Sequence, residues 1–432
     1  MKLLTIAYYY PPQSAVGTLR TVRFLSYLSA QSHQCRVITS ADRDLPFHPQ
    51  GAVLPEVLQS VPCERVPSLP IKPLWQWPTI LIKRLRQCLG LRSINDFEIA
   101  RHFWLLDLEW GWILPAYRAA CRQIKRERPE CLYVSCPPFS SAIVGLLLKH
   151  RFGLPLVLDF RDGWGGSGYH GIGSDHRWEK RLVDAADHLV VTSPSDQAYY
   201  RSLSNTPVSL IHNGYDHPFD TRHADPKPDT PLILTYLGGW DGFRRSPQYL
   251  LTLLAQSDFP WRLLSVGSSN DQVEHWAHRL GVADRVICHD SMAKSQLGSI
   301  LEQTDLLFVN KGEPDPGTTD SHIAAKLFDY IACGKPILSQ LPQGDSANLL
   351  TQWASQHYPL QGNAQDRRLL RQLAQQKKQG RLHSQSAPDG FYQQFSPTFL
   401  AHLLEQQLEE LCELNEAQSE TQLGLNATAR KL

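Results

Sequence analysis

The chain has 432 residues, 42% of them apolar, and its 43 Lys and Arg residues nearly balance 42 Asp and Glu residues, leaving a net charge of +1. This length predicts two domains, and the apolar fraction excludes an intrinsically disordered protein. The balanced charge argues against nucleic acid as the main partner, because binding phosphates usually requires an excess of basic residues.

No stretch of the sequence reaches the roughly 18 apolar residues of a membrane span. The apolar start ends at Pro11-Pro12 without a small-residue cleavage site, which favours a buried first strand over a signal peptide. The 9 cysteines include no Cys-x-x-Cys pair, and the 17 histidines form no convincing set of metal ligands. We therefore expect a cytoplasmic protein with reduced thiols and no metal site.

The first half of the chain alternates strands and helices. A strand at 3–9, a loop at 11–17, a helix at 18–30 and a strand at 35–39 form a β-α-β unit, the building block of a parallel sheet. The alternation returns with helices at 117–126, 140–150 and 178–186 and strands at 131–135, 154–159 and 189–192. These patterns predict a Rossmann-like domain over residues 1–216.

The second half repeats this organisation after a linker. Residues 217–231 contain four prolines and many charges, a composition typical of a linker. Strands at 232–237, 261–266, 286–288, 306–309 and 336–339 then alternate with helices at 248–255, 272–280, 294–302 and 322–333. They predict a second Rossmann-like domain over residues 232–394, and residues 395–432 are predicted to form a C-terminal helix and tail.

Two segments of the first domain place polar groups at the carboxyl ends of predicted strands. The loop that contains Gly17 leads into a helix, so its backbone N–H groups could hold an anion or a sugar hydroxyl, with an ordinary β-α turn as the alternative. Asp159, Arg161 and Asp162 crowd the end of the strand at 154–159. Charges in such a place are costly unless paired or functional, which favours a site over a local Arg–Asp pair.

Two segments of the second domain have the same character. Gly238-Gly239 follows a strand and precedes Arg244-Arg245, which could grip a diphosphate with paired hydrogen bonds; a solvated turn with surface arginines is the alternative. In the predicted helix 322–333, Asp329 lies off the stripe of apolar residues. Its carboxylate could accept both hydroxyls of a ribose, and a solvated helix carboxylate is the alternative.

Four segments, taken in order, resemble the GT-B glycosyltransferases and in particular the retaining family 4, or group 1. They are the strand that ends in Arg161-Asp162, the element His212-Asn213-Gly214-Tyr215-Asp216, the loop Tyr236-Leu237-Gly238-Gly239 with Arg245-Ser246, and Lys326-Leu327-Phe328-Asp329-Tyr330 followed by Cys333-Gly334-Lys335-Pro336. The specificity of the resemblance comes from the occurrence of all four segments in the same order.

The resemblance implies an α/β fold in which two Rossmann-like, doubly wound parallel-sheet domains face a cleft and the C-terminal helix returns to the first domain. It implies a metal-independent retaining glycosyltransferase, without a cofactor, that moves a sugar from a nucleotide-diphosphate sugar to a glycan, lipid-linked or polysaccharide acceptor on the side of the first domain. It assigns catalysis to Arg161 and Asp162. It assigns donor binding to Gly17, Gly238, Gly239, Arg244, Arg245, Ser321, Lys326 and Asp329.

Three positions differ from the family pattern. Ser321 stands where the first of two glutamates is common, Gly239 where an arginine is common, and Arg161 where many members have histidine. Two alternatives therefore stay open. One is a non-hydrolysing sugar-nucleotide epimerase of the same fold, and the other is a non-catalytic protein that binds nucleotide sugars, which the serine at position 321 favours.

One further segment, residues 75–91, combines tryptophans with apolar and basic residues. Helical spacing places Leu81, Ile82 and Leu85 on one face, with Lys83 opposite. This pattern is typical of a helix that lies in a membrane interface, here at the cytoplasmic face, which would bring a lipid-linked acceptor within reach. A helix packed on its own domain is the alternative.

Overall fold

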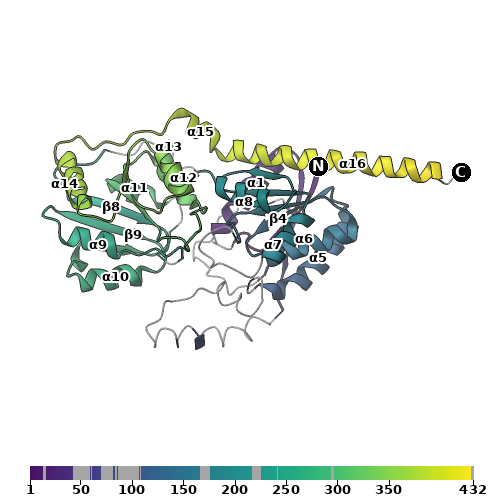
Figure 1. Ribbon diagram of the computed structural model, residues 1–432, viewed down its shortest axis with the longest axis horizontal. Coiled ribbons are helices and arrows are strands. Elements are labelled where there is room, and N and C mark those ends of the chain that lie inside the picture. The colour runs from purple at the N-terminus through teal and green to yellow at the C-terminus, as the bar shows by residue number, and fades with distance from the viewer. Residues whose placement is uncertain are drawn as a thin grey trace. The chain divides into compact units, whose positions relative to one another are not determined.

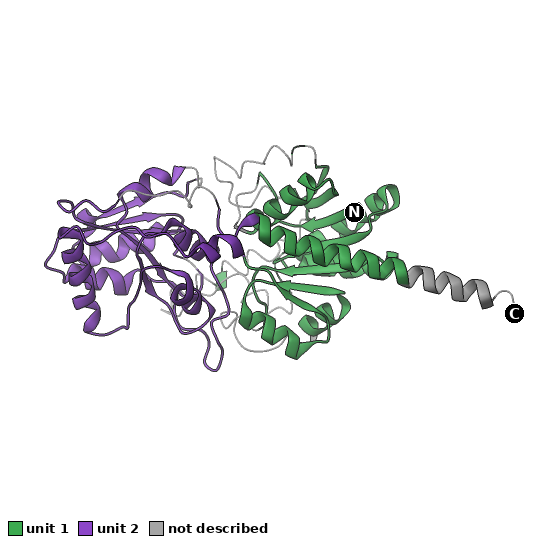
Figure 2. Ribbon diagram, turned by 90° about the horizontal axis from the view of Figure 1, so that it is seen from above, with its two compact units in different colours: residues 1–212, 398–432 green, residues 213–397 purple. Residues whose placement is uncertain are grey.

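The computed structural model describes residues 1–12, 16–41, 59, 61–69, 81–82, 85, 107, 109–165, 176–216, 225–240, 242–292 and 296–429. The chain forms two compact units, shown in green and purple in Figure 2. Unit 1 comprises residues 1–212 and 398–432, and unit 2 comprises residues 213–397. Each unit is built around its own parallel sheet, so the predicted pair of Rossmann-like domains is confirmed.

Unit 1 contains a seven-stranded sheet in the order β3-β2-β1-β4-β5-β6-β7. Its strands are β1 (Lys2–Ala7), β2 (Gln34–Ser40), β3 (Cys63–Val66), β4 (Cys131–Cys136), β5 (Leu156–Phe160), β6 (His188–Val191) and β7 (Val208–Leu210). Its helices are α1 (Val16–Ala30), the 3-10 turn η1 (Trp110–Trp112), α5 (Ile113–Glu127), α6 (Ser140–Phe152), α7 (His176–Ala185) and α8 (Pro194–Leu203) (Figure 1). The strand order reverses between β1 and β4, and ligands of such sheets bind at the carboxyl ends of the strands near this point.

Unit 2 contains a six-stranded sheet in the order β10-β9-β8-β11-β12-β13. Its strands are β8 (Leu232–Leu237), β9 (Trp261–Val266), β10 (Val286–His289), β11 (Leu306–Asn310), β12 (Ile337–Gln340) and β13 (His357–Pro359). Its helices are α9 (Gln248–Ala255), α10 (Asn270–Arg279), η2 (Ala283–Arg285), α11 (Gly298–Gln303), α12 (Ala325–Cys333), α13 (Asp345–Trp353), α14 (Gln365–Lys378) and α15 (Asp389–Gln394). Here the order reverses between β8 and β11, and the loops that follow these two strands contain most of the predicted donor residues.

The central strands of both sheets are buried along their whole length. All six residues of β4 and all five of β11 are buried, because helices cover both faces of each sheet. In unit 1 one apolar cluster joins the sheet to α5, α6, α7 and α8, and a second joins it to α1 and the C-terminal helix. This double burial explains why the strands appear in the sequence as continuous apolar runs rather than as alternating patterns.

The C-terminal helix α16 (Pro397–Ala429), yellow in Figure 1, packs on unit 1 although the chain reaches it from unit 2. Leu400, Ala401, Leu404 and Leu408 are buried among residues of β1, β2 and α1. The predicted return of this helix to the first domain is thus confirmed. Within the described part of the chain, the structure contains no helix with the length and apolarity that crossing a bilayer requires.

Candidate active site

The loop after β8 in unit 2 adopts a costly backbone conformation. Gly242, Phe243 and Arg244 have successive positive φ angles of 75°, 47° and 53°, and Gly238 has a φ of 113°. Residues with side chains rarely adopt the left-handed region, and such strain clusters at binding sites. Gly312, in the loop after the neighbouring strand β11, approaches this loop closely: a Cβ on it would lie only 2.6 Å from the Cβ of Arg244. A glycine is therefore required at this position.

The two predicted arginines of this loop have different partners. Arg244 forms an ion pair with Asp315, and its Nη1 donates to the Glu313 carbonyl at 2.6 Å. Arg245 instead donates from Nη1 to the Gly239 carbonyl at 3.3 Å and stacks its guanidinium 5.1 Å from the Phe243 ring centre. The structure therefore brings Arg245 to the glycine turn, whereas Arg244 is held by acidic and carbonyl oxygens.

Lys326 of α12 lies at the same turn. Its Nζ donates to the Leu237 carbonyl at 3.0 Å and lies 3.7 Å from the centre of the Tyr236 ring, and a Cβ at Gly238 would be 3.6 Å from it. The pKa of Lys326 lies well below its usual value, mainly because the side chain is buried and also because the positive charges of Arg245 and Lys311 are nearby. Two basic side chains thus converge on Gly238 and Gly239, and an anion bound there would favour the charged form of Lys326.

A buried ion pair, which the sequence analysis missed, supports this cluster. Lys311, directly after β11, donates from Nζ to both oxygens of Asp320, to the His322 carbonyl and, at 2.8 Å, to the Ser346 hydroxyl. Both charged side chains are at most 1% exposed, and burial lowers the pKa of Lys311 to about 8. The sequence pattern that could have revealed this ion pair is a lysine directly after a predicted buried strand.

The same pair explains why α12 begins later than predicted. The sequence predicts a helix from His322, but α12 begins at Ala325, after an extended Ala324. Lys311 binds the His322 carbonyl and Asp320 forms a bridge with Gly344, so these residues are engaged outside a helix. The predicted start of this helix was wrong because the competing contacts come from distant parts of the chain.

Ser321 and Asp329 lie on either side of Lys326 in the sequence. Ser321 is 2% exposed, and its hydroxyl has no hydrogen-bond partner among the residues that the structure describes. Asp329 is 4% exposed, and its Oδ1 accepts a hydrogen bond from the Asp216 N–H at 2.9 Å. The alternative of a solvated Asp329 carboxylate was therefore wrong, and the role of Asp329 in holding a ribose stays a prediction.

In unit 1 the structure brings Gly17 and Arg161 together at the carboxyl ends of β1 and β5. A Cβ at Gly17 would lie 1.7 Å from Nη1 of Arg161, so the guanidinium occupies the space that any other residue would fill. The Nη2 of Arg161 donates to the Pro137 carbonyl, and its Cζ lies 5.8 Å from the centre of the Tyr9 ring. Burial raises the pKa of Tyr9, and the charges of Glu109 and Asp162 add to this effect.

Asp159 belongs to the interior rather than to this group. It accepts three hydrogen bonds from Arg20, the shortest at 2.8 Å, and one from the Tyr133 hydroxyl, and all three side chains are buried. Arg20 also donates to the His212 carbonyl at 2.8 Å. The charges at the end of β5 thus divide into the structural pair of Asp159 with Arg20 and the residues Arg161 and Asp162 beyond the strand's end.

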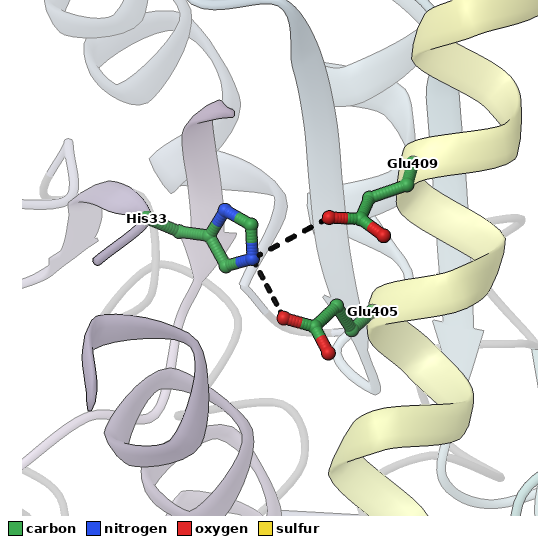
Figure 3. A group of neighbouring side chains, drawn as sticks. All are labelled: His33, Glu405 and Glu409. Carbon is green, nitrogen blue, oxygen red and sulfur yellow. Dashed lines mark hydrogen bonds and ion pairs between the residues drawn. The ribbon is translucent and has the colours of Figure 1, made fainter. Parts of the chain in front are cut away.

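Figure 3 shows the one group of described side chains that is arranged like a metal site: His33, Glu405 and Glu409. The Nε2 of His33 is 2.7 Å from Glu405 and 3.8 Å from Glu409. Glu405 also accepts hydrogen bonds from Tyr27 and His402. Hydrogen bonding within unit 1 accounts for this group, which fastens α16 and shares no residue with the predicted site.

Comparisons with known proteins agree with this architecture. Residues 17–214 match the model of the glycosyl transferase 4-like domain. No curated protein matches the sequence. HepE of Anabaena, solved in complex with UDP and glucose, is 15% identical with a TM-score of 0.61, over 95% of this chain and 100% of that one.

Two further solved structures are similar to this chain over most of its length. Sucrose-phosphate synthase of Thermosynechococcus elongatus is 16% identical with a TM-score of 0.65, over 95% of this chain and 99% of that one. The lipopolysaccharide outer core galactosyltransferase WaaB, in its apo form, is 13% identical with a TM-score of 0.55, over 96% and 100%. At these identities the likeness shows the fold. Together with the matched domain, it confirms the resemblance to the group 1 glycosyltransferases: the chain has the GT-B fold, with a glycosyl transferase 4-like domain as its N-terminal part.

Proposed function

We propose that the protein is a retaining glycosyltransferase that moves a sugar from a nucleotide-diphosphate sugar to a glycan, lipid-linked or polysaccharide acceptor. The observation that carries the donor assignment is the convergence of Arg245 and Lys326 on the Gly238-Gly239 turn. Both side chains lie at a strand's carboxyl end, and burial together with the charges of Arg245 and Lys311 disfavours the protonated form of Lys326. A diphosphate bound at this turn would favour that form.

This arrangement also suggests how the leaving group is stabilised. As the glycosidic bond breaks, negative charge develops on the diphosphate, and preorganised donors in a partly buried site lower the barrier most effectively. Arg245, Lys326 and the backbone N–H groups of the turn would provide those donors, so the proposed reaction needs no metal ion. Activity should survive treatment with a chelator.

The assignments within the donor site differ in their support. Arg244 would need to exchange its ion pair with Asp315 for the phosphates, whereas Arg245 and Lys326 already lie at the glycine turn. Asp329 would accept the ribose hydroxyls, and Ser321 would offer its buried hydroxyl to the donor. Unit 1 would supply Arg161 and Asp162. HepE was solved with UDP-glucose, which makes that compound the first donor to test.

The donor assignment is tested by nucleotide binding. Titration of UDP should show that Arg245→Ala and Lys326→Met each weaken binding by about 1.5–3 kcal/mol, the usual contribution of a hydrogen bond to a charged group. Arg244→Ala should weaken UDP binding by less than either of these substitutions. The matched control is Arg279→Ala on α10, an exposed arginine that stacks on Trp276. Unchanged affinity in a folded Arg245→Ala/Lys326→Met protein would contradict the assignment.

The transfer reaction needs a separate measurement. The purified protein would be incubated with a panel of nucleotide sugars and acceptors, and the anomer of the product determined by NMR. Retention of the donor's configuration is expected. Interconversion of the donor without an acceptor would instead favour the epimerase, and binding without transfer or hydrolysis would favour the non-catalytic protein.

We also propose that the enzyme attaches to an anionic membrane surface through residues 75–91, most of which lie outside the described residues. Leu81 and Leu85, one helical turn apart, are 59% and 52% exposed, which supports an apolar face that a membrane could cover. Burying two leucines in a bilayer contributes about 1.5–3 kcal/mol each. Such a surface would bring a lipid-linked acceptor to the site.

Co-sedimentation with anionic vesicles tests this attachment. Leu81→Glu/Leu85→Glu should abolish binding to the vesicles, because it removes the apolar face and adds charges that anionic lipids repel. The control is Leu147→Glu on α6, which changes a leucine that is also exposed, at 40%. A wild type that stays in solution at low salt, or a double variant that still sediments, would contradict the proposal.

A further inference from the structure

The loop that follows β5 is anchored by a buried carboxylate. Glu179 of α7 is 1% exposed. Its Oε1 accepts hydrogen bonds from the Tyr200 hydroxyl at 2.7 Å and the Gly165 N–H at 2.9 Å, and its Oε2 accepts one from the Tyr199 hydroxyl at 2.9 Å. Both oxygens therefore have donors, which is the condition under which a buried carboxylate is tolerated.

The same group of residues holds a second N–H of the loop. The Tyr200 hydroxyl, which donates to Glu179, accepts a hydrogen bond from the Trp164 N–H at 3.0 Å. The Trp164 ring stacks on Phe139 with ring centres 4.3 Å apart and planes 16° apart. The backbone at positions 164 and 165 is thus fixed through one carboxylate and one tyrosine.

The glycines of this loop show how closely it is pressed onto buried acids. A Cβ at Gly165 would lie 2.4 Å from Oε2 of Glu179 and 2.9 Å from the Tyr199 hydroxyl. A Cβ at Gly163 would lie 2.5 Å from Oδ1 of Asp196. Contacts of this length leave no room for a side chain, so the pattern Gly163-Trp164-Gly165 is explained by the acids beneath it.

We propose that Glu179 is a positioning residue for the reaction: it fixes the loop that carries Arg161 and Asp162. The loop's other end is held where the Thr192 hydroxyl donates to the Arg161 carbonyl at 2.9 Å. Arg161 is therefore anchored itself, and Asp162 lies between it and the anchored positions 164 and 165. This inference rests on the proposed function, since that function gives these two side chains their role, and Glu179 acts through them without reaching the surface.

Two substitutions at Glu179 separate positioning from chemistry. Glu179→Ala removes all three acceptor contacts and releases the loop. Glu179→Gln keeps one carbonyl oxygen for Gly165 and Tyr200, and its amide can donate to the Tyr199 hydroxyl, which is free to rotate. We expect kcat to fall about 100-fold in the alanine variant, the loss that a displacement of about 1 Å can cause, and to stay close to the wild-type value in the glutamine variant.

The dissociation constant of UDP, measured by calorimetry, should be the same in all three proteins, because the nucleotide is assigned to unit 2. Tyr200→Phe keeps the ring but loses the hydroxyl, and it should lower kcat in the same way. This second variant keeps the proposal testable if the alanine variant does not fold. Asp184→Asn is the matched control, as this exposed carboxylate of the same helix pairs with Lys180 at 2.9 Å.

Amide hydrogen exchange without substrate tests the anchoring independently of turnover. Exchange at residues 164 and 165 should accelerate in Glu179→Ala and Tyr200→Phe and remain slow in Glu179→Gln and Asp184→Asn. Unchanged exchange and unchanged kcat in Glu179→Ala would overturn the proposal. It would also be overturned if Glu179→Gln were as inactive as Glu179→Ala and changed the pH dependence of kcat, since Glu179 would then act as an acid or base. A wild type that transfers no sugar but shows the expected exchange would refute the proposed function alone.

Discussion

The protonated form of Lys326 is disfavoured by its surroundings until an anion binds beside it. Burial and the charges of Arg245 and Lys311 depress the pKa of Lys326 in the protein without ligand. A bound diphosphate reverses the sign of the local potential and should raise that pKa again. Binding of the nucleotide and protonation of Lys326 are therefore linked.

This linkage predicts that nucleotide binding takes up protons. Once the pH exceeds the pKa of Lys326 in the ligand-free protein, the lysine is neutral and must gain a proton to bind the phosphates. Affinity should then fall about tenfold for each further pH unit. Calorimetry in buffers with different ionisation enthalpies measures the uptake, which should disappear in Lys326→Met. Equal proton uptake in this variant would show that another group is responsible.

The sequence indicated which residues of the site are charged but not how they pair. Gly17 and Arg161 are 144 positions apart, and their contact depends on the parallel pairing of β1 with β4 and of β4 with β5. Asp159 and Arg161 differ by two positions, yet one pairs with Arg20 in the interior and the other lies at the strand's end. Such partners cannot be predicted from local patterns because they are set by the tertiary fold.

At the scale of elements, the fold was predictable where burial imposes a clear pattern. Strands such as β4 and β11 are continuous apolar runs because both faces of the sheet are covered. The short edge strands β3 and β13 were missed, since few of their residues are buried and their apolar pattern is weak. Boundaries failed where a distant side chain intervenes, as at the start of α12.

The Lys311–Asp320 ion pair joins two parts of the loop between β11 and α12, and its removal should be costly. Lys311→Met leaves the Asp320 carboxylate buried without its cation, which typically costs about 3–5 kcal/mol of unfolding free energy. Denaturant titration should show this loss, and the double variant Lys311→Met/Asp320→Leu should recover most of it. The exposed pair Arg371–Asp258 is the control, for which Arg371→Ala should cost no more than about 1 kcal/mol.

A single variant as stable as the wild type would contradict this account of the pair. It would mean that Asp320 becomes protonated or reaches water without disturbing the loop between β11 and α12. The double variant also separates the contribution of the ion pair to stability from its contribution to nucleotide binding. If nucleotide binding remains weak although stability returns, the ion pair is needed to shape the segment before α12 as well as to stabilise it.

At the scale of the whole molecule, the chain crosses from unit 1 to unit 2 and returns. Residues 398–432 complete unit 1 although they are synthesised after unit 2. The helix α16 covers an apolar face formed by β1, β2 and α1, and His33 and Tyr27 hydrogen-bond to its Glu405. The apolar face formed by β1, β2 and α1 therefore cannot be fully buried until the C-terminal residues have folded onto it.

This topology makes unit 1 dependent on two leucines near the end of the sequence. Leu404 and Leu408 are fully buried, and Leu→Ala substitutions at such positions typically cost about 2–5 kcal/mol because a cavity remains. Leu404→Ala should therefore accelerate hydrogen exchange in β1 and β4 while exchange in β8 and β11 stays unchanged. Leu414→Ala, in the same helix but 52% exposed, should alter stability by less than about 0.5 kcal/mol. Equal acceleration in both sheets would mean that the two units unfold together, whereas no acceleration in β1 would show that α16 does not stabilise the face it covers.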